Sequence, residues 1–131
     1  MLQLSFKSDA KYLRIIRASV KSFLEISGYK GKDAMMIVLA VDEAICNIIR
    51  HGYNERTDGI INFEMSESEG KLYFRLRDYG KKSDPKDFKS RKLDNVRPGG
   101  LGVFLMQKIM DEIDYDTSNS TGTLLTMVKK K

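Results

Sequence analysis

The stretch from Asp42 to His51 spaces polar side chains in a way that could support chemistry. Glu43, Asn47 and His51 follow one another at intervals of four residues, so on a helix they share one face. A carboxylate and an amide oxygen on one face could orient a hydroxyl group and hold a magnesium ion, which prefers oxygen ligands. A solvated stripe at the end of a helix would show the same spacing.

A second carboxylate, Asp78, closes an alternating pattern of apolar and polar residues. Leu72, Phe74 and Leu76 have the same parity as Asp78, so a strand would point all of them toward the core. A buried carboxylate is costly unless it is hydrogen-bonded, and the amine of an adenine ring is one suitable donor. The alternative is that the strand ends earlier and that Asp78 caps a turn with Gly80.

Glycines cluster at Gly99, Gly100 and Gly102, at the start of an amphipathic segment. Glycine lets a backbone approach a phosphate closely, and a helix N-terminus adds free N–H groups and the positive end of a dipole. The cluster has neither the spacing of the dinucleotide fingerprint nor the terminal lysine of a P-loop. By itself it does not define a phosphate site.

The elements that must position these residues come in groups along the chain. Alternation with period two predicts strands, and helical periodicity bounded by caps and glycines predicts helices, the second of them capped by Asp33. The predicted strands cover residues 2–6, 61–65, 72–76 and 123–129, the last entered through a hairpin that turns at 118–122. The predicted helices cover residues 9–28, 33–51 and 101–112, and a long loop covers 80–99.

This order of elements favours an α+β fold, because helices and strands do not alternate strictly. We expect a two-layer sandwich, with a mixed but mostly antiparallel sheet and the helices on one face. The length of 131 residues suits a single domain over residues 1–131.

Composition is typical of a soluble globular protein. Apolar residues make up 41% of the chain, charged residues make up 31%, and the net charge is +5. The longest apolar run, Ala34 to Val41, is too short to span a bilayer, and the N-terminus lacks the layout of a signal peptide. We therefore expect a cytoplasmic protein without membrane binding. The basic stretch from Lys81 to Arg97 would suit nucleic acid, but no predicted helix has a continuous basic face, so this alternative is less favoured.

The segments around Asn47, Asp78 and Gly100 together resemble the sequence boxes of the gyrase, histidine-kinase and MutL type ATPases. These ATPases form the GHKL superfamily with the Bergerat ATP-binding fold. Residues 41–53 resemble the N box, residues 77–85 the first glycine box and residues 97–115 the second. The His-Gly-Tyr ending of the first block and the Met-Asp-Glu sequence in the third are similar to the small anti-sigma factor serine-protein kinases. That resemblance covers nearly the whole chain.

The resemblance implies a role for each matching residue. Glu43 would be the catalytic general base, Asn47 would bind Mg²⁺, and Asp78 would accept a hydrogen bond from the adenine amine with support from Thr123. Arg97, in a lid over residues 81–99, would reach the γ-phosphate. The remaining cofactor-binding positions, at which the lid and the third helix would close on ATP, are Gly80, Gly100, Leu101 and Gly102.

By the same resemblance the chain is expected to be an ATP-dependent serine-protein kinase and anti-sigma factor that phosphorylates an anti-sigma-factor antagonist. Its expected ligands are ATP and Mg²⁺. Its expected partners are the antagonist, a sigma factor and a second copy in a homodimer, without direct nucleic-acid binding. The alternative is a catalytically weak, nucleotide-dependent binding module that sequesters a regulatory partner. Lys82 stands where the first glycine box often has another glycine, so the lid departs from the family pattern there.

Overall fold

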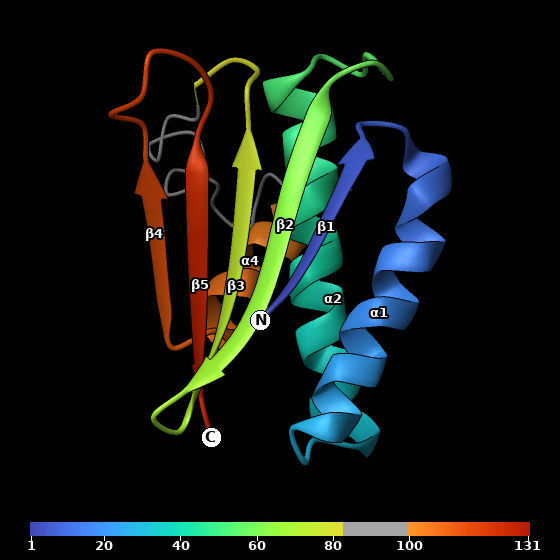
Figure 1. The fold of residues 1–131 in the computed structure, drawn as a ribbon, viewed down its shortest axis with the longest axis vertical. Coiled ribbons are helices and arrows are strands. Elements are labelled where there is room, and N and C mark those ends of the chain that lie inside the picture. The colour runs from blue at the N-terminus through green and yellow to red at the C-terminus, as the bar shows by residue number, and fades with distance from the viewer. Residues whose placement is uncertain (83–99) are drawn as a thin grey trace.

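The computed structural model describes residues 1–82 and 100–131, with the backbone alone described for residues 100–104. Five strands form one sheet in the order β1-β2-β3-β5-β4, and helices cover one of its faces (Figure 1). Every described strand pair is antiparallel, so the sheet has no parallel pair within these residues. The α+β, two-layer architecture predicted from the sequence is confirmed.

The elements follow the predicted order. The strands are β1 (Leu2–Lys7), β2 (Ile60–Ser68), β3 (Lys71–Asp78), β4 (Glu112–Asp116) and β5 (Leu124–Lys130). The helical elements are η1 (Ala10–Tyr12), α1 (Leu13–Ile26), α2 (Gly31–Asn47), the π-helical turn η2 (Ile48–Gly52) and α4 (Gly100–Ile109). None of the helices in the described ranges is both long and apolar enough to cross a bilayer.

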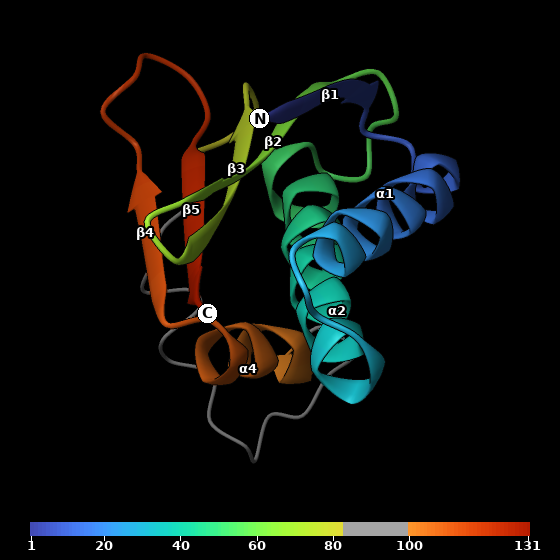
Figure 2. The same ribbon diagram turned by 60° about the horizontal axis from the view of Figure 1, so that its bottom comes forward.

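The core lies between the sheet and the helices (Figure 2). Alternate residues of β2 and β3 are buried, as the period-two pattern predicts. The rings of Phe23 on α1 and Phe74 on β3 meet edge to face with centroids 6.1 Å apart, a geometry that adds about 1 kcal/mol to simple burial. These contacts hold the helices against the sheet. As a result, the end of β3 lies beside the end of α2.

Several predicted helix boundaries differ from those in the structure by a few residues. The second helix begins at Gly31, after an extended Lys30, and Asp33 lies in its first turn instead of capping it. There its carboxylate still interacts favourably with the positive end of the helix dipole. The third helix ends at Ile109, not at 112, because the N–H of Asp111 already donates to the Val128 carbonyl and the chain enters β4.

Candidate functional site

One small cavity brings together three of the predicted site residues, and six elements contribute to its lining. Its lining consists of Ala44 and Asn47 from α2, Ile48 from η2, Asp78 from β3, Met106 from α4, Tyr115 from β4, and Thr123 and Leu125 at β5. Asn47, Asp78 and Thr123, far apart in the sequence, therefore border the same space. Figure 2 shows why: α2 and α4 lie together on one side of the sheet that carries the other lining residues.

Asp78 is the last residue of β3 and is only 2% exposed. Its Oδ1 accepts a hydrogen bond of 3.0 Å from the Gly80 N–H, and its own N–H donates to the Thr123 carbonyl at 3.0 Å. Burial raises the pKa of the Asp78 carboxyl, against backbone hydrogen bonds from Gly80 and Thr123 and the charge of Arg77, which lower it. Both interpretations of the sequence hold in part, because the carboxylate faces the interior and also begins a turn.

Glycines let three backbone segments meet around Asp78. A Cβ atom on Gly80 would lie 2.2 Å from the Gly52 carbonyl oxygen, and one on Gly122 would lie 2.0 Å from the Asp78 carbonyl oxygen. Gly122 also has φ +69°, a conformation that side chains disfavour. The N–H of Lys81 donates to the Gly52 carbonyl at 2.7 Å, which ties the turn after β3 to the end of η2. Gly80 thus has a packing role in the described residues.

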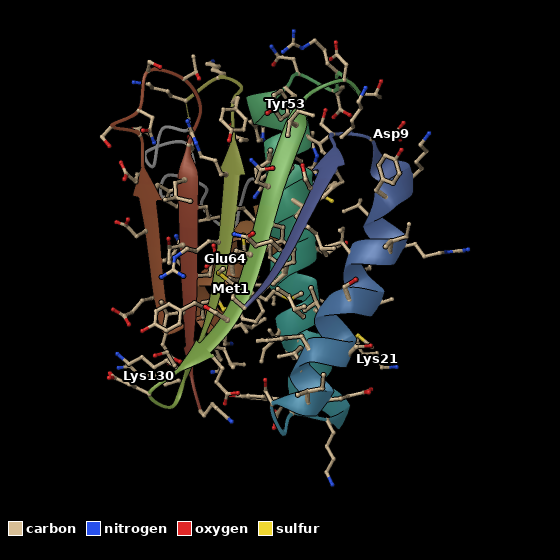
Figure 3. All side chains as sticks on the ribbon, in the orientation of Figure 1. Met1, Asp9, Lys21, Tyr53, Glu64 and Lys130 are labelled. Atoms are coloured by element: carbon tan, nitrogen blue, oxygen red, sulfur yellow. The ribbon has the colours of Figure 1, made fainter. Side chains whose placement is uncertain are left out.

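Tyr53 stabilises the turn that follows β3 through two hydrogen bonds of its hydroxyl. Its side chain is 3% exposed, and its hydroxyl donates to the Ile60 carbonyl at 2.5 Å and accepts from the Tyr79 N–H at 2.8 Å. Its ring leaves no room for a side chain at Gly59, where a Cβ would lie 2.5 Å away. Figure 3 places Tyr53 at the end of the helical layer beside β2. The hydroxyl therefore holds the ends of β2 and β3 in register with the end of the helix.

Asn47 is the last residue of α2 and is 6% exposed. Its Nδ2 lies 4.0 Å from the Met106 sulfur, a weak contact, and its Oδ1 has no hydrogen-bond partner among the described residues. Leaving a buried acceptor unsatisfied costs about 1–3 kcal/mol, so this oxygen is available for a ligand. An amide oxygen is a suitable donor for Mg²⁺, which usually takes few protein ligands and completes its shell with water and phosphate. The residues present therefore fit a nucleotide-bound Mg²⁺.

The predicted face shared by Glu43, Asn47 and His51 is only partly formed. Glu43 is half-buried one turn before Asn47, whereas His51 is exposed. The reason is the π-helical turn, in which the Tyr53 N–H donates to the Ile48 carbonyl five residues earlier. The wider turn rotates the following residues away from the position that an α-helix would give them.

Three predicted positions have only their backbone described. Gly100, Leu101 and Gly102 form the first turn of α4, as the sequence predicted for a helix that begins there. Gly102 lies one helical turn before Met106, which lines the cavity. Arg97 and the predicted lid beyond Lys82 lie outside the described residues.

The cavity is smaller than the adenine nucleotide that the sequence predicts it to bind. It offers about 10 Å³, room for a single water molecule. An adenine ring is larger than this space, so a wall of the cavity would have to move for an adenine to bind there. Met106 forms part of that wall, and its flexible, unbranched side chain can change rotamer at little cost.

Several residues of the site were not singled out from the sequence. Met106 and Tyr115 line the cavity, and burial raises the pKa of the Tyr115 phenol to about 12, so it stays neutral. No spacing signal identifies them, because they reach the cavity only through the packing of α4 and β4. Gly52 and Tyr53 belong to the His-Gly-Tyr ending of the first block. That ending supports the family resemblance but by itself predicts no structural role.

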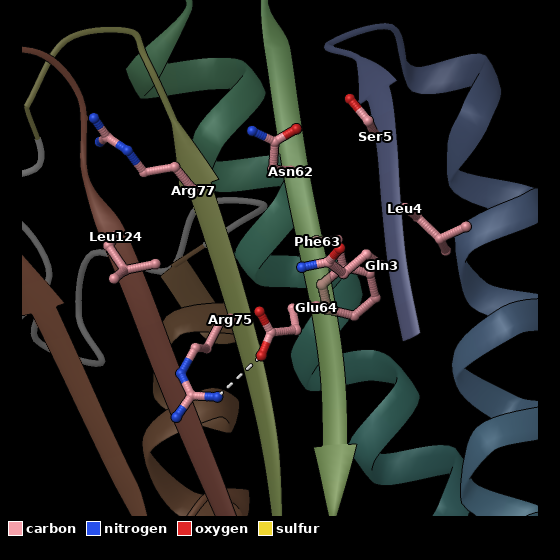
Figure 4. Close-up of a pocket in the computed structure, with 9 residues that line it drawn as sticks. All are labelled: Gln3, Leu4, Ser5, Asn62, Phe63, Glu64, Arg75, Arg77 and Leu124. Atoms are coloured by element: carbon pink, nitrogen blue, oxygen red, sulfur yellow. Dashed lines mark hydrogen bonds and ion pairs between the residues drawn. The ribbon is translucent and has the colours of Figure 1, made fainter. Parts of the chain in front are cut away.

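A second hollow lies on the opposite, outward face of the sheet (Figure 4). Two of its charged side chains are engaged: Arg75 pairs with Glu64 at 3.3 Å, and Arg77 donates to the Asp78 backbone carbonyl at 2.8 Å. None of the sequence-predicted site residues lines it. We assign no function to this hollow.

Comparison with known proteins identifies the family. Residues 6–129 match the family described as the histidine kinase-like ATPase domain. The chain belongs to this family. Membership implies ATP binding, and the cavity that contains Asn47 and Asp78 is where the candidate residues for it converge.

The chain is also similar, along nearly its whole length, to proteins of comparable size. The chain is 29% identical over 140 residues to the serine-protein kinase RsbW of Staphylococcus aureus strain bovine RF122 / ET3-1, covering 99% of this chain and 88% of the relative. The same figures hold for RsbW of S. aureus strain MRSA252.

Solved structures share the fold at lower identity. A Mycobacterium tuberculosis structure of RsbU and RsbW domains matches with a TM-score of 0.65 and 18% identity, covering 99% of this chain and 32% of that one. The histidine kinase domain of a blue-light activated histidine kinase from Erythrobacter litoralis matches with a TM-score of 0.59 and 20% identity, covering 92% and 59%. These likenesses establish the fold.

Proposed function

We propose that this protein is an ATP-dependent serine-protein kinase and anti-sigma factor that phosphorylates an anti-sigma-factor antagonist. The observation that carries the proposal is the buried, unsatisfied Oδ1 of Asn47 in the cavity that also holds Asp78. The full-length similarity to the serine-protein kinase RsbW supports the choice of reaction.

The roles we propose follow from chemistry and position. Asp78 accepts the adenine amine, with Thr123 beside it, and Asn47 contributes an oxygen to Mg²⁺. Glu43, one helical turn before Asn47, is the general base for the serine hydroxyl. Mg²⁺ would neutralise charge that develops on the phosphate oxygens during transfer. The first turn of α4, at Gly100 to Gly102, would supply backbone N–H groups to a phosphate.

The partners we propose are the antagonist, a sigma factor and a second copy of this chain. The unphosphorylated antagonist would bind this protein and release the sigma factor. Phosphoserine then adds a charge of about −2 at that interface and breaks the complex.

A phosphorylation assay with a matched pair of variants tests the proposal. Purified protein is incubated with labelled ATP, Mg²⁺ and the anti-sigma-factor antagonists of the same organism. We expect Glu43→Gln to bind ATP as the native protein does and to lower phosphoserine formation by roughly a hundredfold or more. Glu112→Gln, an exposed carboxylate on β4, serves as the control and should leave the rate unchanged.

Two outcomes would contradict the proposal. Undiminished phosphorylation by Glu43→Gln would exclude Glu43 as the base. Nucleotide-dependent capture of an antagonist without any covalent phosphate would instead favour the binding-module alternative.

A further inference from the structure

A groove of about 630 Å³ runs between α1 and the first half of α2, the two helices that lie side by side at the edge of the sheet in Figure 1. Its lining begins at Arg17 on α1 and ends at Val38 on α2. No residue of this groove lines the candidate nucleotide cavity, which lies at the other end of α2. A function for the groove is therefore independent of the proposed kinase chemistry.

The floor of the groove is apolar. It consists of Ala18 from α1 and Ala34, Met35 and Val38 from α2. Met35 is 53% exposed, and Leu39, one turn further along the same face, is 44% exposed. Small side chains leave room for an incoming residue, and an exposed methionine adapts its shape to different partners. Exposed large apolar side chains beside a concave surface mark an interaction site.

The rim of the groove is basic. Lys21, Lys30 and Lys32 line it and form no ion pair with any described residue. Arg17 is neutralised by Asp42 at 2.8 Å, and Glu25 supplies the opposing charge on the rim. Figure 3 shows Lys21 on the outer side of α1. Three ammonium groups against one carboxylate favour an acidic partner.

We propose that this groove docks an amphipathic helix of a partner protein, with an apolar face flanked by acidic residues. The α1 side of the groove, from Arg17 to Glu25, spans about 12 Å, or roughly two helical turns, which matches the reach of apolar anchors at i, i+4 and i+7. The apolar floor takes those anchors, and the lysines pair with the acidic flanks.

The test uses two labelled synthetic helices of roughly 15 residues that share one leucine face. One carries glutamate on its flanks and the other carries lysine at the same positions. Fluorescence anisotropy with the full chain should show at least tenfold tighter binding of the glutamate peptide. Lys21→Glu combined with Lys32→Glu should weaken that binding about tenfold, while Lys7→Glu, an exposed lysine on β1, should leave it nearly unchanged.

A second pair of variants tests the apolar floor. Ala18→Tyr fills the groove from an exposed helical position, and Ala10→Tyr adds the same bulk at an exposed site outside it. We expect only Ala18→Tyr to abolish peptide binding, with both variants showing the native thermal unfolding transition.

Three results would overturn the proposal: no binding of the glutamate peptide, equal affinity for the two peptides, or equal effects of Ala18→Tyr and Ala10→Tyr. Sedimentation of the native protein and Ala18→Tyr adds a fourth. If the substitution converts a dimer to a monomer, the occupant is a second copy of this chain and not an acidic helix.

Discussion

The carboxyl of Asp78 is ionisable and buried, so its contribution to the free energy of unfolding should depend on pH. Desolvation raises the pKa of its carboxyl in the folded state above the unfolded value of about 3.9. The folded state then binds the proton more tightly, so the contribution is complete below about pH 4 and is lost as the pH rises through the higher, folded pKa.

Urea denaturation of the native protein and Asp78→Asn measures this. The free energy of unfolding of the native protein should fall relative to that of the variant as the pH rises from about 4 to 7. Asp116→Asn is the control of opposite sign, because hydrogen bonds from Ser118 hold the pKa of Asp116 below its ordinary range. A constant difference between the native protein and Asp78→Asn would contradict the effect of burial.

Asn47 should lower the stability of the ligand-free protein while providing an oxygen for Mg²⁺. Its buried Oδ1 has no partner among the described residues, so Asn47→Leu removes an unsatisfied group without leaving a large cavity. We expect the ligand-free variant to unfold at the same temperature as the native protein or higher, and to lose the effect of Mg²⁺ on ATP binding. Asn62→Leu, at a site where the amide donates to the Tyr79 hydroxyl at 2.9 Å, should retain that effect.

At the scale of elements, the site depends on how η2 meets the end of β3. The Tyr53 hydroxyl joins the Ile60 carbonyl to the Tyr79 N–H. Tyr53→Phe leaves both groups without their partner and should lower the free energy of unfolding by about 1–3 kcal/mol. Chemical denaturation should show less than half of that loss for Tyr73→Phe, whose hydroxyl makes no hydrogen bond to the described residues.

The backbone contact between Gly52 and Gly80 is a second element-level constraint. Gly80→Ala places a Cβ 2.2 Å from a carbonyl oxygen, so the two segments must separate at a cost of about 1–3 kcal/mol. ATP affinity should fall with it, because Gly80 donates to Asp78. Gly70→Ala meets nothing within 4 Å and carries only the strain of φ +75°. Its ATP affinity, measured by calorimetry, should match that of the native protein.

For the whole molecule, ATP should act as a stabilising ligand. A ligand that binds only the folded chain at a hundred times its Kd adds about 2.7 kcal/mol to the free energy of unfolding, which corresponds to roughly 10 °C in Tm for a domain of this size. Differential scanning fluorimetry with Mg²⁺ and ATP should show this rise, and Asp78→Asn should remove most of it. An unchanged Tm for the native protein at saturating ATP would contradict the nucleotide site.

The sequence determined the elements, their order and the family boxes, because the alternation of strands and the periodicity of helices are local properties. Asn47 and Asp78 could be selected from it because a polar residue in an apolar pattern stands out without any knowledge of contacts. Only the tertiary structure decided that Met106 and Tyr115 join them, that Gly52 touches Gly80, and that the cavity has room for about one water molecule. These facts depend on the strand order and on how α4 packs, which bring together residues whose separation in the chain carries no signal.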